Sequence, residues 1–241
     1  MKTLKEIRTY ERNKSVASSL WQVFEFQGEG FPAWVYDEQR IARKLHEFGF
    51  SLGEEDYLYI CLNAELDENQ IVFSHLDFDK CTLYADFGAN PSQFNALSCE
   101  NQRIFIQNMI FSVLKAKTSP QMVYLLAKTE QEVTKYGKNI KILHKIKETS
   151  AYMVRIFYQI NPDEKPLSLS EKNGGVAIIE YLDKKTHKTS IFTYPLYFYD
   201  DIFSLMNTIT LKNNSLIIKP KTSFRAEIEN KHYQTPLVFE L

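Results

Sequence analysis

The segment IVFSHLDFDK, residues 71–80, holds the residue types best suited to chemistry. His75, Asp77 and Asp79 alternate along it. Alternate residues of an extended chain lie on one face, at intervals of about 7 Å. One imidazole and two carboxylates are the ligand set of many hydrolytic metal sites. One interpretation is therefore a hydrolase with a dispersed site around His75, Asp77 and Asp79, with or without a metal.

The same segment has a simpler interpretation. Three same-face residues in a row do not reach one ion unless the strand bends, and Asp86 or Glu65 would have to add a further ligand. The apolar run Ile71 to Phe73 followed by polar residues is typical of a strand that leaves the core and ends in a solvated turn. On this interpretation we predict no catalytic residue, no metal and no cofactor.

Local fingerprints of the common enzyme classes are absent from the sequence. It contains no G-x-G-x-x-G, no P-loop and no G-x-S-x-G. His46 and Glu47 begin like H-E-x-x-H, but the fifth residue is Phe50. Any catalytic function would therefore depend on residues distant in sequence.

The distribution of charge favours a binding function. The net charge is only −1, yet residues 54–86 contain a single base, Lys80. The acids of that segment are Glu54, Glu55, Asp56, Glu65, Asp67, Glu68, Asp77, Asp79 and Asp86. Residues 101–150 are lysine-rich instead. An acidic surface attracts a basic partner, and the alternative is that these acids pair with the later lysines.

Aromatic residues gather in IFTYPLYFYDDIF, residues 191–203. Tyrosine is favoured at binding hot spots because it brings a large contact area at a low entropy cost. Tyr194, Tyr197 and Tyr199 are candidate partner-contacting residues, and packing in the core is the alternative. Bases are sparse in this run, which is a poor match to a nucleic-acid stacking surface.

These features together predict a non-catalytic protein-binding module. Its most concrete form is a bacterial immunity protein, an inhibitor that neutralises a basic, nuclease-like toxin through Glu54, Glu55, Asp56, Glu65, Asp67 and Glu68. The polar N-terminus has no signal-peptide pattern, and no apolar run reaches about 18 residues. We expect a cytoplasmic protein with a protein partner, and neither a membrane nor nucleic acid as its target.

Helices and strands must position these candidate residues. The chain has 241 residues, of which 44% are hydrophobic and 24% charged, as in ordinary globular proteins. The periodicity predicts a loose helix or arm over 1–15 and then strands at 19–27, 56–63, 69–76, 80–87, 121–128 and 139–147. The strands at 69–76 and 80–87 are predicted to be antiparallel. It predicts helices from Asp37 to Phe48, from Asn90–Pro91, and over about 101–117. The capping-box pattern TEQE, residues 129–132, predicts a short helix that ends at Gly137.

After residue 150 the pattern becomes β-rich. Strands are predicted at 151–160, 174–182 and 188–196, and the last two are predicted to pair as a hairpin. One helix is predicted at 200–207, and short strands at 215–220, at 223–230 (SFRAEIEN) and at 235–241. The fold class is therefore α+β, with mixed, mainly antiparallel sheets, three to five helices and a β-rich C-terminal third. We predict a single domain over residues 1–241; the alternative has two lobes that meet near residue 150.

Overall fold

The computed structural model describes residues 2–11, 23–27, 33–76, 79–165 and 171–241. It divides the chain into two compact units, Met1–Gly137 and Lys138–Leu241. Helices and mainly antiparallel sheets are mixed, and the C-terminal region is rich in strands, so the predicted α+β class is confirmed. The single-domain assignment for residues 1–241 stays a prediction.

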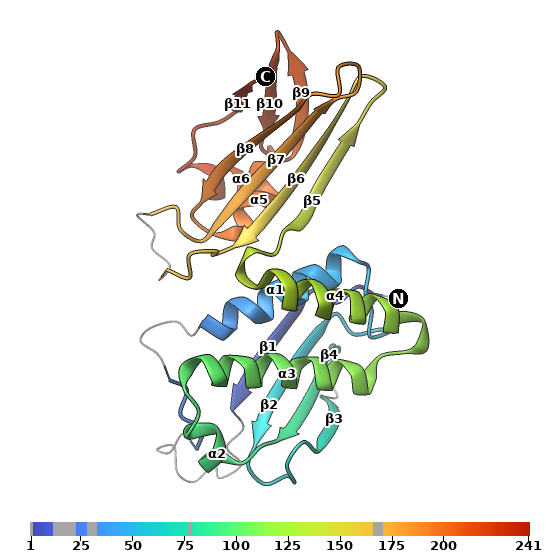
Figure 1. Ribbon diagram of the computed structural model, residues 1–241, viewed down its shortest axis with the longest axis vertical. Helices are drawn as coiled ribbons and strands as arrows, with labels where there is room; N and C mark the ends of the chain where they lie inside the picture. The colour runs from blue at the N-terminus through green and yellow to red at the C-terminus, as the bar shows by residue number, and fades with distance from the viewer. Residues whose placement is uncertain (1, 12–22, 28–32, 77–78, 166–170) are drawn as a thin grey trace. The chain divides into compact units, whose positions relative to one another are not determined.

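The amino-terminal unit is built on a four-stranded sheet (Figure 1). Its strands are β1 (Glu6–Glu11), β2 (Tyr57–Asn63), β3 (Ile71–Leu76) and β4 (Asp79–Gly88), in the order β1-β2-β4-β3. β2 pairs in parallel with both β1 and β4, whereas β3 is antiparallel to β4. The prediction of a central strand at 56–63 is confirmed.

Helices cover one face of this sheet (Figure 1). They are α1 (Ala33–Glu47), α2 (Pro91–Asn95), α3 (Cys99–Lys117) and α4 (Val123–Tyr136), with 3-10 turns at Pro120–Met122 and Gly137–Asn139. The sheet residues beneath them are buried, among them Ile7, Leu58 and Leu83, which share one register row. The predicted helix start is confirmed, because the Asn90 side chain accepts a hydrogen bond from the amide of Gln93.

Three predictions for the amino-terminal unit are wrong: the helix or arm over 1–15, the described part of the strand at 19–27, and the helix cap at Asp37. The first strand is β1, where a loose helix or arm was predicted, and residues 23–27 are not a strand. The rest of the predicted 19–27 strand lies outside the described residues. Asp37 does not cap a helix, because it lies within α1 and its buried carboxylate binds arginines.

The strand predicted at 121–128 is also wrong, because this segment turns into α4. Its buried residues Leu126, Thr129 and Val133 recur at helical spacing, which a short apolar run does not reveal. Thr129 lies inside the helix and its hydroxyl donates to the carbonyl of Leu125 at 2.9 Å, so TEQE is not a helix start. Gly137 does end α4, with φ of 49°.

The carboxyl-terminal unit contains two antiparallel sheets. One has β5 (Ile142–Glu148), β6 (Tyr152–Ile160), β7 (Gly175–Asp183) and β8 (Thr189–Leu196) in chain order; the other has β9 (Thr208–Lys212), β10 (Ser215–Lys219) and β11 (Leu237–Glu240). The ring centroids of Phe192 on β8 and Phe239 on β11 are 5.1 Å apart, so side chains of the two sheets meet. The predicted hairpin between β7 and β8 is confirmed.

Two short helices complete this unit, α5 (Ile202–Leu205), preceded by a 3-10 turn at Tyr199–Asp201, and α6 (Phe224–Asn230). The strand predicted at 223–230 is wrong. Ser223 caps α6 by accepting from the amide of Ala226, and Ala226 and Asn230 are buried one helical turn apart. The strand, helix and strand predicted at 121–128, 129–137 and 139–147 would form a β–α–β unit, and this is wrong as well, because β5 follows a helix and pairs antiparallel with β6. The described residues contain six α-helices, one more than the predicted maximum. Within those same residues, no helix has the length and apolar character that crossing a membrane requires.

Glu38 on α1 is a buried acid that makes stability depend on pH. Its side chain is almost fully buried, and this burial raises its pKa well above the ordinary value of 4.5. The neighbouring Asp37 adds to the rise, while the backbone of Thr9 on β1 partly opposes it. The folded protein therefore keeps a proton that the unfolded chain releases.

We expect Glu38→Gln to remove this pH dependence. A raised folded-state pKa gives stability that is complete below pH 4.5 and is lost as the pH rises toward the folded-state pKa. The stability of the variant relative to wild type should therefore grow as the pH rises above 4.5, by at most about 1.4 kcal/mol per pH unit, until the pH passes the folded-state pKa. Urea unfolding across this range measures the difference. Glu100→Gln, at an exposed position, is the control. If the difference in free energy of unfolding between Glu38→Gln and wild type did not change with pH, Glu38 would not have a raised pKa in the folded protein.

Candidate functional site

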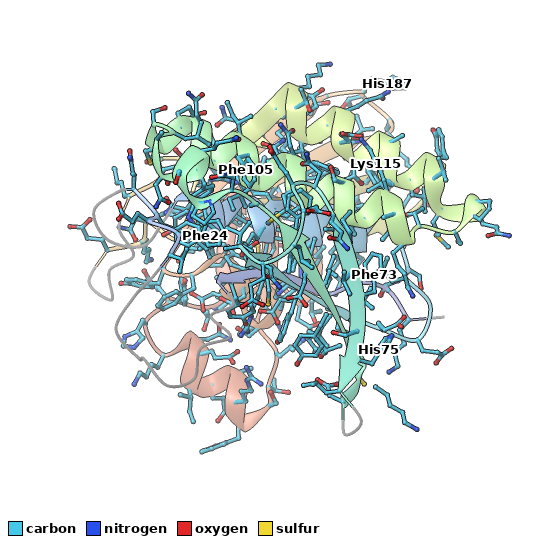
Figure 2. All side chains as sticks on the ribbon, turned by 90° about the horizontal axis from the view of Figure 1, so that it is seen from below. Phe24, Phe73, His75, Phe105, Lys115 and His187 are labelled. Atoms are coloured by element: carbon cyan, nitrogen blue, oxygen red, sulfur yellow. The ribbon has the colours of Figure 1, made fainter. Side chains whose placement is uncertain are left out.

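The structure separates the residues of the 71–80 segment. β3 ends at Leu76 and β4 begins at Asp79, and the two strands are antiparallel, which confirms the strands predicted at 69–76 and 80–87. The alternative of one continuous strand over 71–79 is therefore wrong. His75 lies near the end of β3 (Figure 2), where its Nε2 is 3.4 Å from Glu55 Oε1. Asp77 lies outside the described residues. His75 and Asp79 therefore do not share one face of one strand.

Asp79 has a structural role at the start of β4. Its Oδ1 accepts a hydrogen bond from the amide of Cys81 at 3.0 Å, and the hydroxyl of Thr82 is the first cause of its lowered pKa. Among the described residues, which exclude Asp77, no three His, Cys, Asp or Glu side chains gather in a way that could hold a metal. The hydrolase interpretation stays a prediction.

A pocket in the carboxyl-terminal unit does not involve these residues. It has a volume of about 340 Å³. It is lined by Asn207, Thr208, Lys219, Pro220, Thr222, Thr235 and Pro236. This lining contains no acid, histidine or cysteine, so it offers no thiol nucleophile, and its one titratable side chain is that of Lys219.

The acidic segment divides between the two ends of β2. Glu54, Glu55 and Asp56 precede the strand, and Glu65, Asp67 and Glu68 follow it. A strand rises about 3.3 Å per residue, so the seven residues of β2 place the two groups roughly 20 Å apart. The acids that are contiguous in sequence therefore form two separate groups rather than one surface.

The group before β2 is partly paired within the chain. Asp56 is buried and its carboxylate binds Lys5 Nζ at 2.6 Å, a contact that also raises the pKa of that lysine. Glu55 faces His75, and Lys2 forms a backbone bridge with Gly53. Of the three acids, only Glu54 is exposed. This end of the strand therefore offers little unpaired negative charge to a partner.

The group after β2 lies on residues 64–70, here called the acidic loop, which joins β2 to β3 (Figure 1). Glu65, Asp67 and Glu68 are exposed. Neither Asp67 nor Glu68 forms an ion pair with any part of the chain that the structure describes. Backbone amides within the loop are nevertheless bonded: that of Glu65 donates to Asn63 Oδ1 at 2.9 Å and that of Gln70 to Asp67 O at 2.9 Å.

Gly88, at the end of β4, fixes the acidic loop to the sheet. The amide of Asn69 donates to the carbonyl of Gly88 at 2.9 Å, and the amide of Gly88 donates to the carbonyl of Gln70 at 2.8 Å. The loop approaches so closely that a Cβ at position 88 would lie 1.8 Å from Asp67 O. Only glycine permits this approach, so the three carboxylates are presented on a rigid loop.

Gly88→Ala is expected to displace the acidic loop and destabilise the protein by about 1–3 kcal/mol, because backbone rather than a flexible side chain meets the new methyl group. Gly49→Ala is the control. Gly49 has φ of 75°, and a Cβ at this position would have no atom within 4 Å, so the substitution adds backbone strain of about 1 kcal/mol without a clash. Thermal unfolding and amide exchange at residues 64–70 measure both effects. Unchanged exchange in the loop of Gly88→Ala would contradict the role of Gly88.

Three of the four lysines of residues 138–147 have partners within their own unit. Lys141 Nζ lies 3.2 Å from Glu180 Oε1, and Lys147 Nζ donates to the carbonyl of Ile209 at 2.5 Å. Lys145 donates to the carbonyl of Asn207. The contacts of Lys145 and Lys147 join β5 to residues 207–209 at the start of β9, and that of Lys141 reaches β7. They give these lysines a structural use that is separate from the acidic loop.

The three tyrosines predicted as partner contacts do not form one group. Tyr199 stacks on Tyr158, with ring centroids 6.3 Å apart and planes 6° apart. Tyr194 and Tyr197 instead gather around Lys172, together with Tyr233. Lys172 and Tyr233 were not predicted from the sequence, because loops far apart in the chain bring them together.

A second tyrosine group, on the amino-terminal sheet, was not predicted either. Tyr10, Tyr59 and Tyr84 lie on β1, β2 and β4, and their neighbouring ring centroids are 5.5 and 5.6 Å apart. The guanidinium of Arg8 lies 5.6 Å from the ring centre of Tyr59. The alternation of part-exposed Tyr57 and Tyr59 with buried leucine and isoleucine was the available signal.

Comparison with known proteins does not identify the family of this chain. No family model, no curated protein and no solved structure matches the chain. Among the surfaces described above, the acidic loop is the one that combines exposed charge with a backbone fixed to the sheet.

Proposed function

We propose that the protein is a non-catalytic protein-binding module that uses the acidic loop to bind a basic partner. In its most concrete form it is a bacterial immunity or inhibitor protein that acts inside the cell on a basic, nuclease-like toxin. The observation that carries the proposal is the attachment of residues 64–70 to Gly88, which holds three exposed acidic side chains on a rigid loop.

Rigid presentation favours binding for two reasons. Loops that are already ordered lose less conformational entropy when a partner binds. Carboxylates held on a fixed backbone can also occupy the positions where a nucleic-acid-binding protein expects phosphates, and their charge accelerates the encounter. The acids before β2 fit this role less well, because Asp56 is paired with Lys5 and Glu55 faces His75.

Differential capture tests the proposal. Immobilised wild-type protein is incubated with lysate from its native cell, next to a loop-reversed variant in which Glu65, Asp67 and Glu68 are all replaced by lysine. A charge-matched variant, with lysine at the exposed positions Asp163, Glu171 and Glu227, has the same net charge. The proposal requires a stoichiometric basic protein that wild type and the charge-matched variant retain and the loop-reversed variant loses. Equal retention by all three would contradict it.

A further inference from the structure

The carboxyl-terminal unit contains a cation enclosed by aromatic rings. Lys172 Nζ lies 5.0 Å from the ring centre of Tyr194, 5.5 Å from that of Tyr197 and 5.0 Å from that of Tyr233. The face of an aromatic ring attracts a cation within about 6 Å of its centre. All three rings meet this distance, and we call them the tyrosine cage.

Hydrogen bonds fix the orientation of Tyr233, one of the three rings of the cage. The Tyr233 hydroxyl donates to Asp201 Oδ2 at 2.5 Å and accepts from the amide of Tyr197 at 2.8 Å. Tyr233 is buried, and burial together with the Asp201 carboxylate raises its pKa, so the phenol stays protonated as the donor. Donation to a carboxylate increases the electron density of the ring, which strengthens its attraction for a cation. Asp201 is itself held by the amide of Phe198 at 3.0 Å.

The backbone around Lys172 is also fixed to the cage. The amide of Gly174 donates to the carbonyl of Leu196 at 3.1 Å, and a Cβ at Gly174 would lie 2.1 Å from Tyr197 O. This close approach ties the backbone two residues after Lys172 to the end of the strand that carries Tyr194. The lysine side chain therefore reaches the cage from an anchored position.

A primary ammonium is poorly matched to this environment. Its one hydrogen bond to the described part of the protein is to the Tyr194 hydroxyl, at the long distance of 3.5 Å. No carboxylate of the described residues forms an ion pair with Lys172. An ammonium with three N–H donors gains little from such a site, whereas an alkylated ammonium has fewer or no donors and needs only the ring faces.

We propose that the tyrosine cage is a binding site for alkylated ammonium cations and that Lys172 occupies it as an internal competitor. The site is independent of the acidic loop and of the proposed function. An internal competitor lowers the apparent affinity for a ligand, because only the fraction of molecules with an empty cage can bind. Removal of the lysine side chain should therefore expose the full affinity of the site.

Choline is the probe, and 3,3-dimethyl-1-butanol, its uncharged analogue of the same shape, is the control ligand. Binding is followed through the ring signals of labelled tyrosines in nuclear magnetic resonance. Lys172→Ala should bind choline about tenfold more tightly than wild type, with shifts at all three cage rings. Lys165→Ala, in the same loop, should resemble wild type. The uncharged analogue should bind at least about tenfold more weakly than choline.

A peptide that carries trimethyllysine distinguishes the source of the cation. Tighter binding than choline would assign the site to a modified protein, and equal binding would assign it to a free small molecule; either result supports the cage. A folded Lys172→Ala protein with no choline-dependent ring shifts would overturn the proposal. The wild type provides a test that needs no variant, because the rings must shift the Lys172 Hε signals upfield from those of other lysines. An absence of that shift would also overturn it.

Discussion

Asp37→Ala is expected to lower the free energy of unfolding by about 3–5 kcal/mol, because it removes one partner of a buried ion-pair network. The Asp37 side chain is 8% exposed and that of Arg40 is 1% exposed, and Arg40 Nη1 lies 2.7 Å from Asp37 Oδ1. Arg103 on α3 binds the same carboxylate through two nitrogens, one of them Nη2 at 2.9 Å. Asp37 therefore joins α1 to α3, and its loss leaves two guanidinium groups without their shared carboxylate.

An exposed pair in the same protein is the matched control for Asp37. Arg225 Nε lies 2.6 Å from Glu229 Oε1, a distance similar to that of the buried pair, but the Arg225 side chain is 89% exposed. Solvent screens such a pair, so Glu229→Ala should cost less than about 1 kcal/mol. Urea unfolding monitored by tryptophan fluorescence and circular dichroism measures both variants. If both variants lowered the free energy of unfolding by the same amount, burial of the Asp37 network would contribute nothing to stability.

The loop-reversed variant is expected to associate with the basic partner about 10- to 100-fold more slowly at low salt, because steering by opposite charge is replaced by repulsion. The three acidic side chains of the loop are exposed. Their replacement by lysine should therefore leave the free energy of unfolding within about 0.5 kcal/mol of the wild-type value. The charge-matched variant has the same net charge and should associate at nearly the wild-type rate. Stopped-flow or surface-binding kinetics give the rate constants. If both variants slowed equally, net charge rather than the acidic loop would govern association.

Elements with strong local signals were predictable from the sequence. The Asn90–Pro91 start of α2, the apolar stripe of α3 and the hairpin of β7 and β8 each depend on residues close together in the chain. Segment 121–128 was not predictable in this way, since a short apolar run fits a strand or a buried helix equally well. Residues 223–230 alternate like a strand, but the Ser223 cap and the burial of Ala226 and Asn230 favour a helix.

The candidate sites were only partly predictable, because they depend on distances through space. Glu54 and Glu68 belong to one acidic segment in sequence, yet the length of β2 separates them. The glycine that fixes the acidic loop comes from a different strand, and its role appears only where the loop meets Gly88. Lys172 and Tyr233 are 61 positions apart in sequence, and no local pattern places them in one cage.

The salt dependence of association tests the central claim most directly. The association rate constant of the captured partner is measured against ionic strength for wild type, the loop-reversed variant and the charge-matched variant. If the acidic loop steers the partner, the wild-type and charge-matched rates fall steeply as salt rises, whereas the loop-reversed rate stays flat or increases. A loop-reversed variant with the same steep decline as wild type would contradict binding through residues 64–70.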